Sequence, residues 1–112
     1  MTEREILRAI RLELGGRSDL VLWRNSTGTA EYYDRSGRPH RVPYGLVPGA
    51  SDLIGILAPS GRLVALEVKT ARGRVSKDQK MFLNLVRRMG GIGAVVRSVD
   101  DAIDAIEGEI AC

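Results

Sequence analysis

The chain has 112 residues, of which 44% are hydrophobic and 28% charged, proportions typical of one globular domain with a single core. Its formal net charge of +3 and pI of about 9.4 are compatible with a polyanionic partner without requiring one. The only cysteine, Cys112, excludes a disulfide framework and a cysteine-based zinc cluster. No apolar run approaches the ~20 residues of a membrane helix, and no signal-peptide pattern is present. We therefore expect residues 1–112 to form one domain in a reducing compartment, not a secreted or membrane protein.

The first predicted element is a helix from Glu3 to about Leu14. Thr2 and Glu5 have the spacing of a capping box, and Gly15-Gly16 is typical of a helix end. One apolar stripe marks the buried face and consists of Ile6, Leu7, Ile10 and Leu14. Glu3 falls within this stripe, whereas Glu5 falls away from it. Glu3 is therefore either aimed at the interior or only compensates the helix dipole, and the sequence leaves both open.

Residues 20–24 predict the first strand, and residues 25–29 a flexible polar loop. Residues 30–48 are interrupted by glycines and prolines, which predicts a loop or a short β-excursion. Basic residues alternate there with tyrosines, a pattern that suits phosphate contacts and base stacking but equally a solvated loop: Tyr32, Tyr33, Arg35, Arg38, His40, Arg41 and Tyr44. His40 is the only histidine, so a histidine pair for a metal is not expected.

Two apolar segments between residues 49 and 69 carry charges that do not suit an apolar core. A Pro-Ser-Gly break at 59–61 predicts that they pair as a hairpin, which would set Asp52 beside Glu67. Glu67 and Lys69 share one face because strand side chains alternate with period two. Converging carboxylates with an ammonium group suit a hard divalent cation. The alternative is an internal salt bridge between Glu67 and Lys69.

The remaining sequence predicts a helix, a strand and a last helix. Ser76 and Gln79 have capping-box spacing and open a helix that runs to about Met89. Its expected apolar stripe is Phe82, Leu85, Val86 and Met89. Gln79 lies at the edge of this stripe, so it either faces the sheet or only caps the helix, or does both. Residues 93–97 predict a strand.

Ser98 and Asp101 have the spacing that caps the last helix, whose apolar face is Val99, Ala102, Ile103 and Ile106. The predicted fold class is α/β, with a mixed β-sheet flanked by helices.

Asp52 followed by Glu67-Val68-Lys69 resembles the signature of the PD-(D/E)xK nuclease superfamily. With its surroundings, the chain resembles a stand-alone VRR-NUC domain of the phage and bacterial type, similar to Holliday junction resolvases. The resemblance rests on residues 44–55, 67–70, 73–79 and 90–91. Ser51 stands where many superfamily members have proline, and residues 30–40 match nothing in the family. The resemblance implies a restriction-endonuclease-like core with the order α-β-β-β-α-β.

The resemblance also implies roles for particular residues. Asp52 and Glu67, with the backbone carbonyl of Val68, would hold Mg²⁺ or Mn²⁺, and Glu3 would complete the site. Lys69 would orient or deprotonate the attacking water. Gln79 would steady Lys69 or the scissile phosphate.

The implied activity is metal-dependent hydrolysis of DNA phosphodiester bonds by a homodimer, on branched DNA such as Holliday junctions. The compartment would be the cytoplasm of a bacterial cell or of a phage-infected host. The residues expected to contact DNA are Arg24, Ser26, Arg72, Arg74 and Lys77, with Lys80 on the same basic rim. Ser26 is included through the family resemblance, and each cation is alternatively ordinary solvated surface.

Two other hypotheses fit the same residues. A nuclease-fold DNA-binding module would bind DNA without cutting it. A small scaffold would use Glu67 and Lys69 only as a structural pair and would bind no metal.

Overall fold

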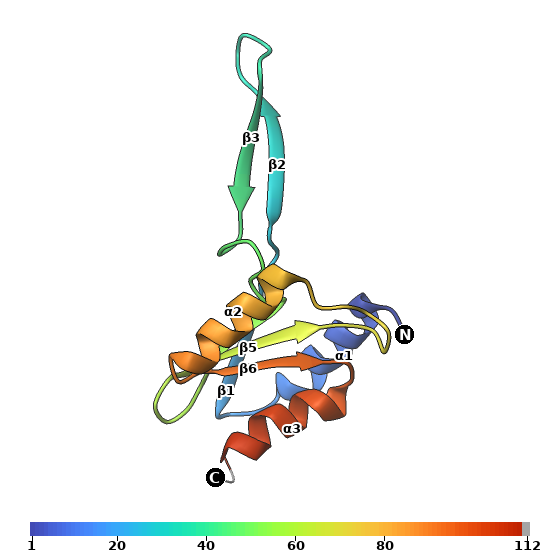
Figure 1. The fold of residues 1–112 in the computed structure, drawn as a ribbon, viewed down its shortest axis with the longest axis vertical. Coiled ribbons are helices and arrows are strands. Elements are labelled where there is room, and N and C mark those ends of the chain that lie inside the picture. The colour runs from blue at the N-terminus through green and yellow to red at the C-terminus, as the bar shows by residue number, and fades with distance from the viewer. Residues whose placement is uncertain (111–112) are drawn as a thin grey trace.

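The computed structural model describes residues 1–110. Within them, three helices accompany a four-stranded sheet and a separate two-stranded hairpin (Figure 1). In chain order the elements are α1 (Glu3–Leu14), β1 (Leu20–Arg24), β2 (Gly28–Tyr33), β3 (Pro39–Tyr44), β4 (Leu53–Leu57), β5 (Arg62–Val68), α2 (Lys77–Arg88), β6 (Ile92–Val96) and α3 (Val99–Ile110).

The four-stranded sheet has the order β1-β4-β5-β6 and is mixed. β4 pairs antiparallel with both β1 and β5, whereas β5 and β6 are parallel. The parallel pair is joined through α2, as parallel strands require a crossover. The predicted hairpin around residues 59–61 is therefore confirmed, and the mixed α/β class with it.

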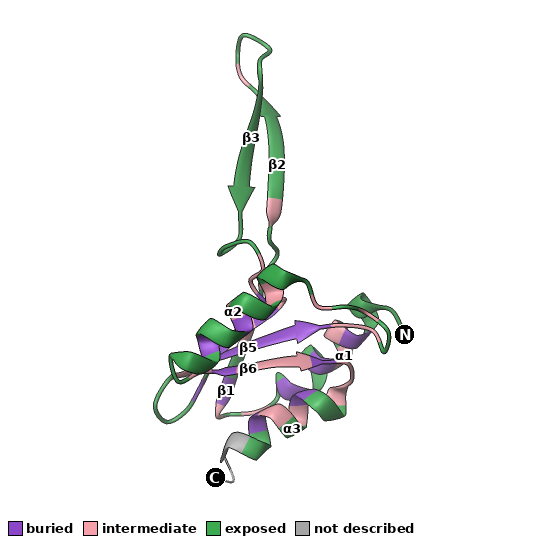
Figure 2. Ribbon diagram, in the orientation of Figure 1, coloured by how far each residue is buried: buried purple, intermediate pink, exposed green. Residues whose placement is uncertain are grey.

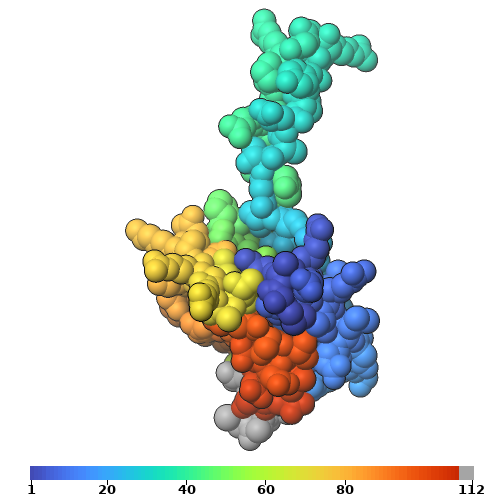
Figure 3. Space-filling view, turned by 90° about the vertical axis from the view of Figure 1, so that its right-hand side faces the viewer, coloured from blue at the N-terminus to red at the C-terminus, as the bar shows by residue number. Residues whose placement is uncertain are grey.

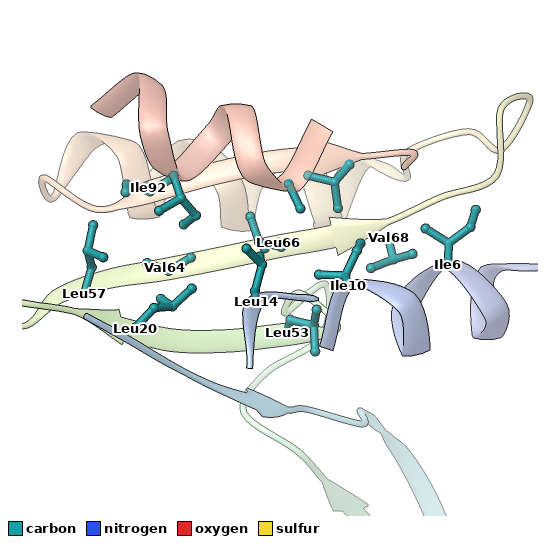
Figure 4. Packing of buried hydrophobic residues seen from close by; sticks show 13 residues of the cluster. Ile6, Ile10, Leu14, Leu20, Leu53, Leu57, Val64, Leu66, Val68 and Ile92 are labelled. Atoms are coloured by element: carbon teal, nitrogen blue, oxygen red, sulfur yellow. The ribbon is translucent and has the colours of Figure 1, made fainter. Parts of the chain in front are cut away.

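Helices cover both faces of this sheet. α1 and α3 pack on one face, where Ile6, Ile10 and Leu14 of α1 contact the core side chains of β4 and β5 (Figure 4). α2 packs on the other face through Leu83 and Val86. Since strand side chains alternate, the even-numbered residues of β5 face α1, and the odd-numbered residues, Glu67 included, face α2.

Both capping boxes form as predicted. The Thr2 and Ser76 side chains accept hydrogen bonds from the N3 backbones of their helices, and the N3 side chains Glu5 and Gln79 accept from the N-cap backbones. α3 is opened by Ser98, whose hydroxyl accepts from the Asp101 backbone.

The predicted stripe of α2 was partly wrong. Leu85 and Met89 are exposed, and Leu83 is buried instead. The buried face runs through Gln79, Leu83 and Val86, at i, i+4 and i+7, so it is rotated toward Leu83 from the stripe expected.

Residues 28–44 form a projecting hairpin, here called the arm. Of the two alternatives for residues 30–48, a loop or a short β-excursion, the β-excursion is confirmed, whereas residues 28 and 29, which were expected in a loop, belong to β2. The order α-β-β-β-α-β that the resemblance implies for the core omits β2 and β3, whereas the predicted last helix is confirmed as α3. The arm stands clear of the body in two perpendicular views (Figures 1 and 3) and is exposed along nearly its whole length (Figure 2). It gives the molecule its long axis of 57 Å, against 32 and 28 Å for the other two.

None of the helices within residues 1–110 has both the length and the hydrophobicity needed to cross a bilayer. Cys112, on which the expectation of a reducing compartment partly rested, lies outside the described residues.

Candidate active site

Asp52 and Glu67 lie together because of the register between β4 and β5. Leu53 pairs with Leu66, so the residue before β4 lies opposite Glu67. Oδ2 of Asp52 accepts a hydrogen bond of 2.9 Å from the Val68 backbone N–H, which holds its carboxylate at the end of β5. Both acids line one pocket of about 360 Å³. The hairpin thus brings the two carboxylates to the same side of the sheet.

Glu67 is a buried acid in an unfavourable environment. Its residue is 2% exposed, and within the described chain its Oε2 atom has no hydrogen-bond partner. Burial raises the pKa of Glu67 to about 8, and the neighbouring carboxylate of Asp52 raises it further than Lys69 lowers it. An acid held this way favours either a proton or a cation beside it.

Lys69 lies on the same face as Glu67, as the strand alternation predicted. Its Nζ is 3.9 Å from Oε1 of Glu67, and its side chain is only 12% exposed. The ion pair considered as an alternative is therefore present, but it sits within an acidic pair rather than in place of one. One ammonium group beside two carboxyl groups does not satisfy both, and within residues 1–110 the Oε2 atom of Glu67 stays without a hydrogen-bond partner.

Gln79 contacts Glu67 directly. Its Nε2 donates a hydrogen bond of 2.9 Å to Oε1 of Glu67, while its Oε1 accepts one of 2.8 Å from the Ser76 backbone. Gln79 therefore both caps α2 and faces the sheet, as one of the sequence alternatives allowed. The carboxylate it steadies is that of Glu67, whereas the family resemblance implied Lys69 or the phosphate.

The chain on either side of the arm forms the rest of the pocket wall. Arg24 and Ser26 line it, as do residues that sequence reasoning missed: Asn25, Thr27, Gly49 and Ala50. Asn25 fixes the segment before β4 by donating from its side chain to the Ser51 carbonyl and from its backbone to that of Asp52. Asn25 could have been identified as a site residue from the sequence, because it is a polar residue directly after an apolar strand.

Gly49 permits a close approach at this wall. Its φ of +85° is a left-handed conformation that favours glycine, and a Cβ there would strike the backbone of Asp78. The segment leading into Asp52 can therefore pack against the first turn of α2, which carries Gln79.

Other expected site residues do not line the pocket. Glu3 is exposed, so it does not point into the core, although its charge adds to the raised pKa of Glu67. Arg74 and Lys77 are exposed elsewhere, and Arg72 lines a separate hollow between α1 and the loop after β5.

The donor set fits a hard cation with few protein ligands. Across residues 1–110, no cluster of three or more acidic, histidine or cysteine side chains is placed to hold a metal. The two carboxylates and the unpartnered buried Oε2 of Glu67 nevertheless supply oxygen donors with a charge to be neutralised. Mg²⁺ commonly takes only one or two protein carboxylates and keeps several waters.

A mixed sheet whose central hairpin sets Asp52 beside Glu67, with Lys69 two residues on, is the arrangement expected of the PD-(D/E)xK nuclease superfamily. Residues 43–100 match the VRR-NUC domain family, a span of just over half the chain. The chain belongs to this family, a PD-(D/E)xK nuclease family. Comparison with curated proteins finds no match.

Proposed function

We propose that this VRR-NUC domain is a metal-dependent DNA endonuclease. The observation that carries the proposal is Glu67: a buried carboxylate with an unpartnered oxygen, set beside Asp52 in an open pocket. A purely structural ion pair would not require a second acid. In a family of nucleases, this pair is the natural place for the ion that hydrolysis needs.

The core is restriction-endonuclease-like in this proposal. The two acids lie at one end of a four-stranded sheet. In this sheet β1, β4 and β5 are antiparallel, and α2 connects β5 to the parallel strand β6. α1 begins near that end, which explains why the charge of Glu3 is felt by Glu67. Glu3 would then act from a distance, or through water, rather than as a buried ligand.

Asp52 and Glu67 would hold Mg²⁺ or Mn²⁺. The N–H of Val68 points toward Asp52, and in a strand the carbonyl of the same residue points to the same neighbour. The Val68 carbonyl is therefore a suitable third oxygen. Such an ion screens the phosphate charge and lowers the pKa of a bound water.

Lys69 and Gln79 prepare this site before substrate arrives. The Lys69 ammonium lies close enough to Glu67 to hold a water beside the carboxylate or to stabilise negative charge on the phosphate oxygens. The Gln79 amide fixes the Glu67 carboxylate in one orientation. Hydrolysis adds water across one P–O ester bond, and the departing oxygen takes up a proton.

The preferred substrate in our proposal is branched DNA such as a Holliday junction, cut by a homodimer. The support is the similarity of stand-alone VRR-NUC domains to junction resolvases, together with the need for two sites to cut two strands symmetrically. Arg24 and Ser26 at the pocket, and the exposed Arg72, Arg74 and Lys77, would contact the phosphate backbone.

Isosteric variants of the two acids test the activity. Asp52→Asn keeps an acceptor for the Val68 N–H, and Glu67→Gln replaces a buried carboxyl that is costly to ionise with a neutral amide of the same shape, so both should fold. Labelled linear, flapped, splayed and four-way DNAs are incubated with Mg²⁺ and with Mn²⁺. We expect cleavage by the natural chain and a loss of at least a hundredfold in each variant.

Two results would count against this function. Unchanged cleavage in both variants would place the chemistry elsewhere. Binding of DNA by the natural chain without cleavage in either metal would favour the non-cleaving DNA-binding module.

A further inference from the structure

The arm is the largest feature of the molecule that the catalytic pocket leaves unexplained. The family match begins at residue 43, so almost the whole arm precedes it. Both of its faces are exposed (Figure 2), and it buries no residue in either core cluster. An isolated two-stranded hairpin is only marginally stable in water, so such an arm needs its own internal contacts.

Those contacts are concentrated near the tip. The Asp34 carboxylate accepts hydrogen bonds from the backbones of Ser36 and Arg38 and pairs with Nε2 of His40 at 2.9 Å. The His40 ring in turn stacks on Tyr32, with centroids 4.9 Å apart and an interplanar angle of 12°. The turn is therefore held in one shape before any partner binds.

The base of the arm is fixed to the catalytic pocket. Residues 25–27, which lead into β2, line that pocket, as do Gly49 and Ala50 after β3. Gly45, with φ of +88°, lets the returning strand pack against the Ser26 carbonyl and Thr27. Any molecule that the arm grips is thereby placed in register with Asp52 and Glu67.

The charges of the arm favour an anionic partner. Arg35 and Arg38 are exposed at the tip, and neither guanidinium has an acidic partner among the described residues. Asp34, the nearby acid, is already engaged by the turn and His40. Nearer the base of the arm, Nε of Arg41 lies 4.0 Å from Oε1 of Glu31.

The aromatic side chains add flat contact surface. Tyr33 is 70% exposed and Tyr44 48% exposed, on opposite faces of the ribbon by the strand register. Rings on both faces suit a partner that surrounds the ribbon, such as the walls of a groove.

We propose that the arm enters a groove of duplex DNA beside the scissile phosphate and so positions the duplex in the catalytic pocket. This inference rests on the proposed DNA nuclease function. The major groove of B-DNA, about 12 Å wide, admits a two-stranded β-ribbon, and both of its rims carry phosphates for Arg35 and Arg38. A symmetric arm-to-arm contact with a second copy would instead bring these like charges together.

The test compares two variants of equal net charge. Arg35→Gln with Arg38→Gln removes the tip charges, whereas Arg88→Glu removes the same charge from exposed α2. Binding of a fluorescein-labelled duplex is followed by anisotropy in EDTA. Hydrolysis of bis(p-nitrophenyl) phosphate with Mn²⁺ reports the pocket alone, and sedimentation reports the oligomeric state.

We expect the tip variant to bind duplex DNA about tenfold more weakly, while Arg88→Glu changes binding less than threefold. Hydrolysis of the small phosphodiester should be equal in both. Equal DNA binding by the two variants would overturn the role of the arm, and so would a loss of dimer in the tip variant alone. Failure of the natural chain to hydrolyse any phosphodiester would instead reject the nuclease function.

Discussion

Nε2 of Gln79 donates a hydrogen bond of 2.9 Å to Oε1 of Glu67, which joins the first turn of α2 to the buried acid of β5. The oxygen of the same amide accepts from the Ser76 backbone. One side chain therefore closes a helix cap and orients a candidate metal ligand. We therefore expect substitutions at the cap and at the contact with Glu67 to affect stability and cleavage rate differently.

Gln79→Ala should lower both stability and activity. The variant loses the reciprocal half of the capping box and the donor to Glu67, so we expect the free energy of unfolding to fall by about 1–2 kcal/mol. Without the amide, Glu67 is free to turn toward Lys69, and cleavage should slow by at least tenfold. Urea unfolding and single-turnover cleavage at saturating Mn²⁺ measure the two effects.

Ser76→Ala is the matched control. It removes the hydroxyl that caps the same turn, at a cost of about 1 kcal/mol, but leaves Gln79 beside Glu67. Its cleavage rate should stay near that of the natural chain. Equal losses of activity in the two variants would show that Gln79 acts only through the helix.

The metal-free protein should lose stability as the pH rises. The pKa of Glu67 is raised from 4.5 to about 8 in the folded chain, mainly by burial and secondly by Asp52. Between these values the folded chain keeps a proton that the unfolded chain releases. The stabilisation is complete below the unfolded pKa and is lost as pH rises through about 8, with a slope of at most ~1.4 kcal/mol per pH unit. Urea titrations in EDTA across this range measure the slope.

Glu67→Gln should abolish this part of the pH dependence and be the more stable protein at high pH. Saturating Mn²⁺ should oppose the same slope in the natural chain, because a cation binds the deprotonated carboxylates. A natural chain whose metal-free stability is flat between pH 5 and 8 would contradict the raised pKa.

The sequence predicted the centre of the fold because local signals there agree with one another. Both capping boxes, the break at residues 59–61 and the alternation through Glu67 and Lys69 each specify short-range geometry. Together they fix the register that sets Asp52 beside Glu67. The contact of Gln79 with Glu67 follows from its position on the buried face of α2, and it was foreseen only as one alternative.

The arm was foreseen only as one alternative, a short β-excursion, because its strands lack the burial that makes a strand recognisable. No alternation of apolar and polar residues appears when both faces meet solvent. Pro39 and Pro43 left a loop equally open, yet proline is tolerated within β3 because the ribbon has free edges. The exposure of Glu3 depends on how the first turn of α1 extends past the sheet, which helical periodicity alone cannot show.

Arg97 should control the loop that follows Lys69. Its Nη1 donates to the Thr70 and Gly73 carbonyls at 2.6 and 2.8 Å, so one half-buried guanidinium holds the first and last residues of the turn at 70–73. Arg97→Met removes these bonds, and we expect a loss of about 1.5–3 kcal/mol in unfolding free energy.

Limited trypsin digestion measures how accessible this loop is to cleavage, because Arg72 and Arg74 are trypsin sites within the segment between β5 and α2. We expect cleavage there to become faster in Arg97→Met under conditions where the fold is intact, with Arg88→Met as the control. If both variants are cut at the natural rate, the loop does not depend on Arg97.

A groove beside α1 should contribute to the salt dependence of DNA binding. It is lined by Arg4, Leu7, Arg8, Arg11, Leu12 and Arg24, and we call it the arginine groove. The three helix arginines share one face at i, i+4 and i+7, and Arg24 also lines the candidate catalytic pocket with Asp52 and Glu67. A phosphate backbone leaving the pocket past Arg24 would therefore meet a continuous line of cations.

Changing Arg4, Arg8 and Arg11 together to Gln should weaken duplex binding by at least tenfold at low salt. It should also lower the slope of log K against log[salt] by about 2–3, since each phosphate contact contributes about 0.9. The helix should survive because these side chains lie outside the buried stripe of Ile6, Ile10 and Leu14. Anisotropy titrations at several salt concentrations measure the slope, and a variant that keeps the natural slope would show that the backbone leaves the pocket by another route.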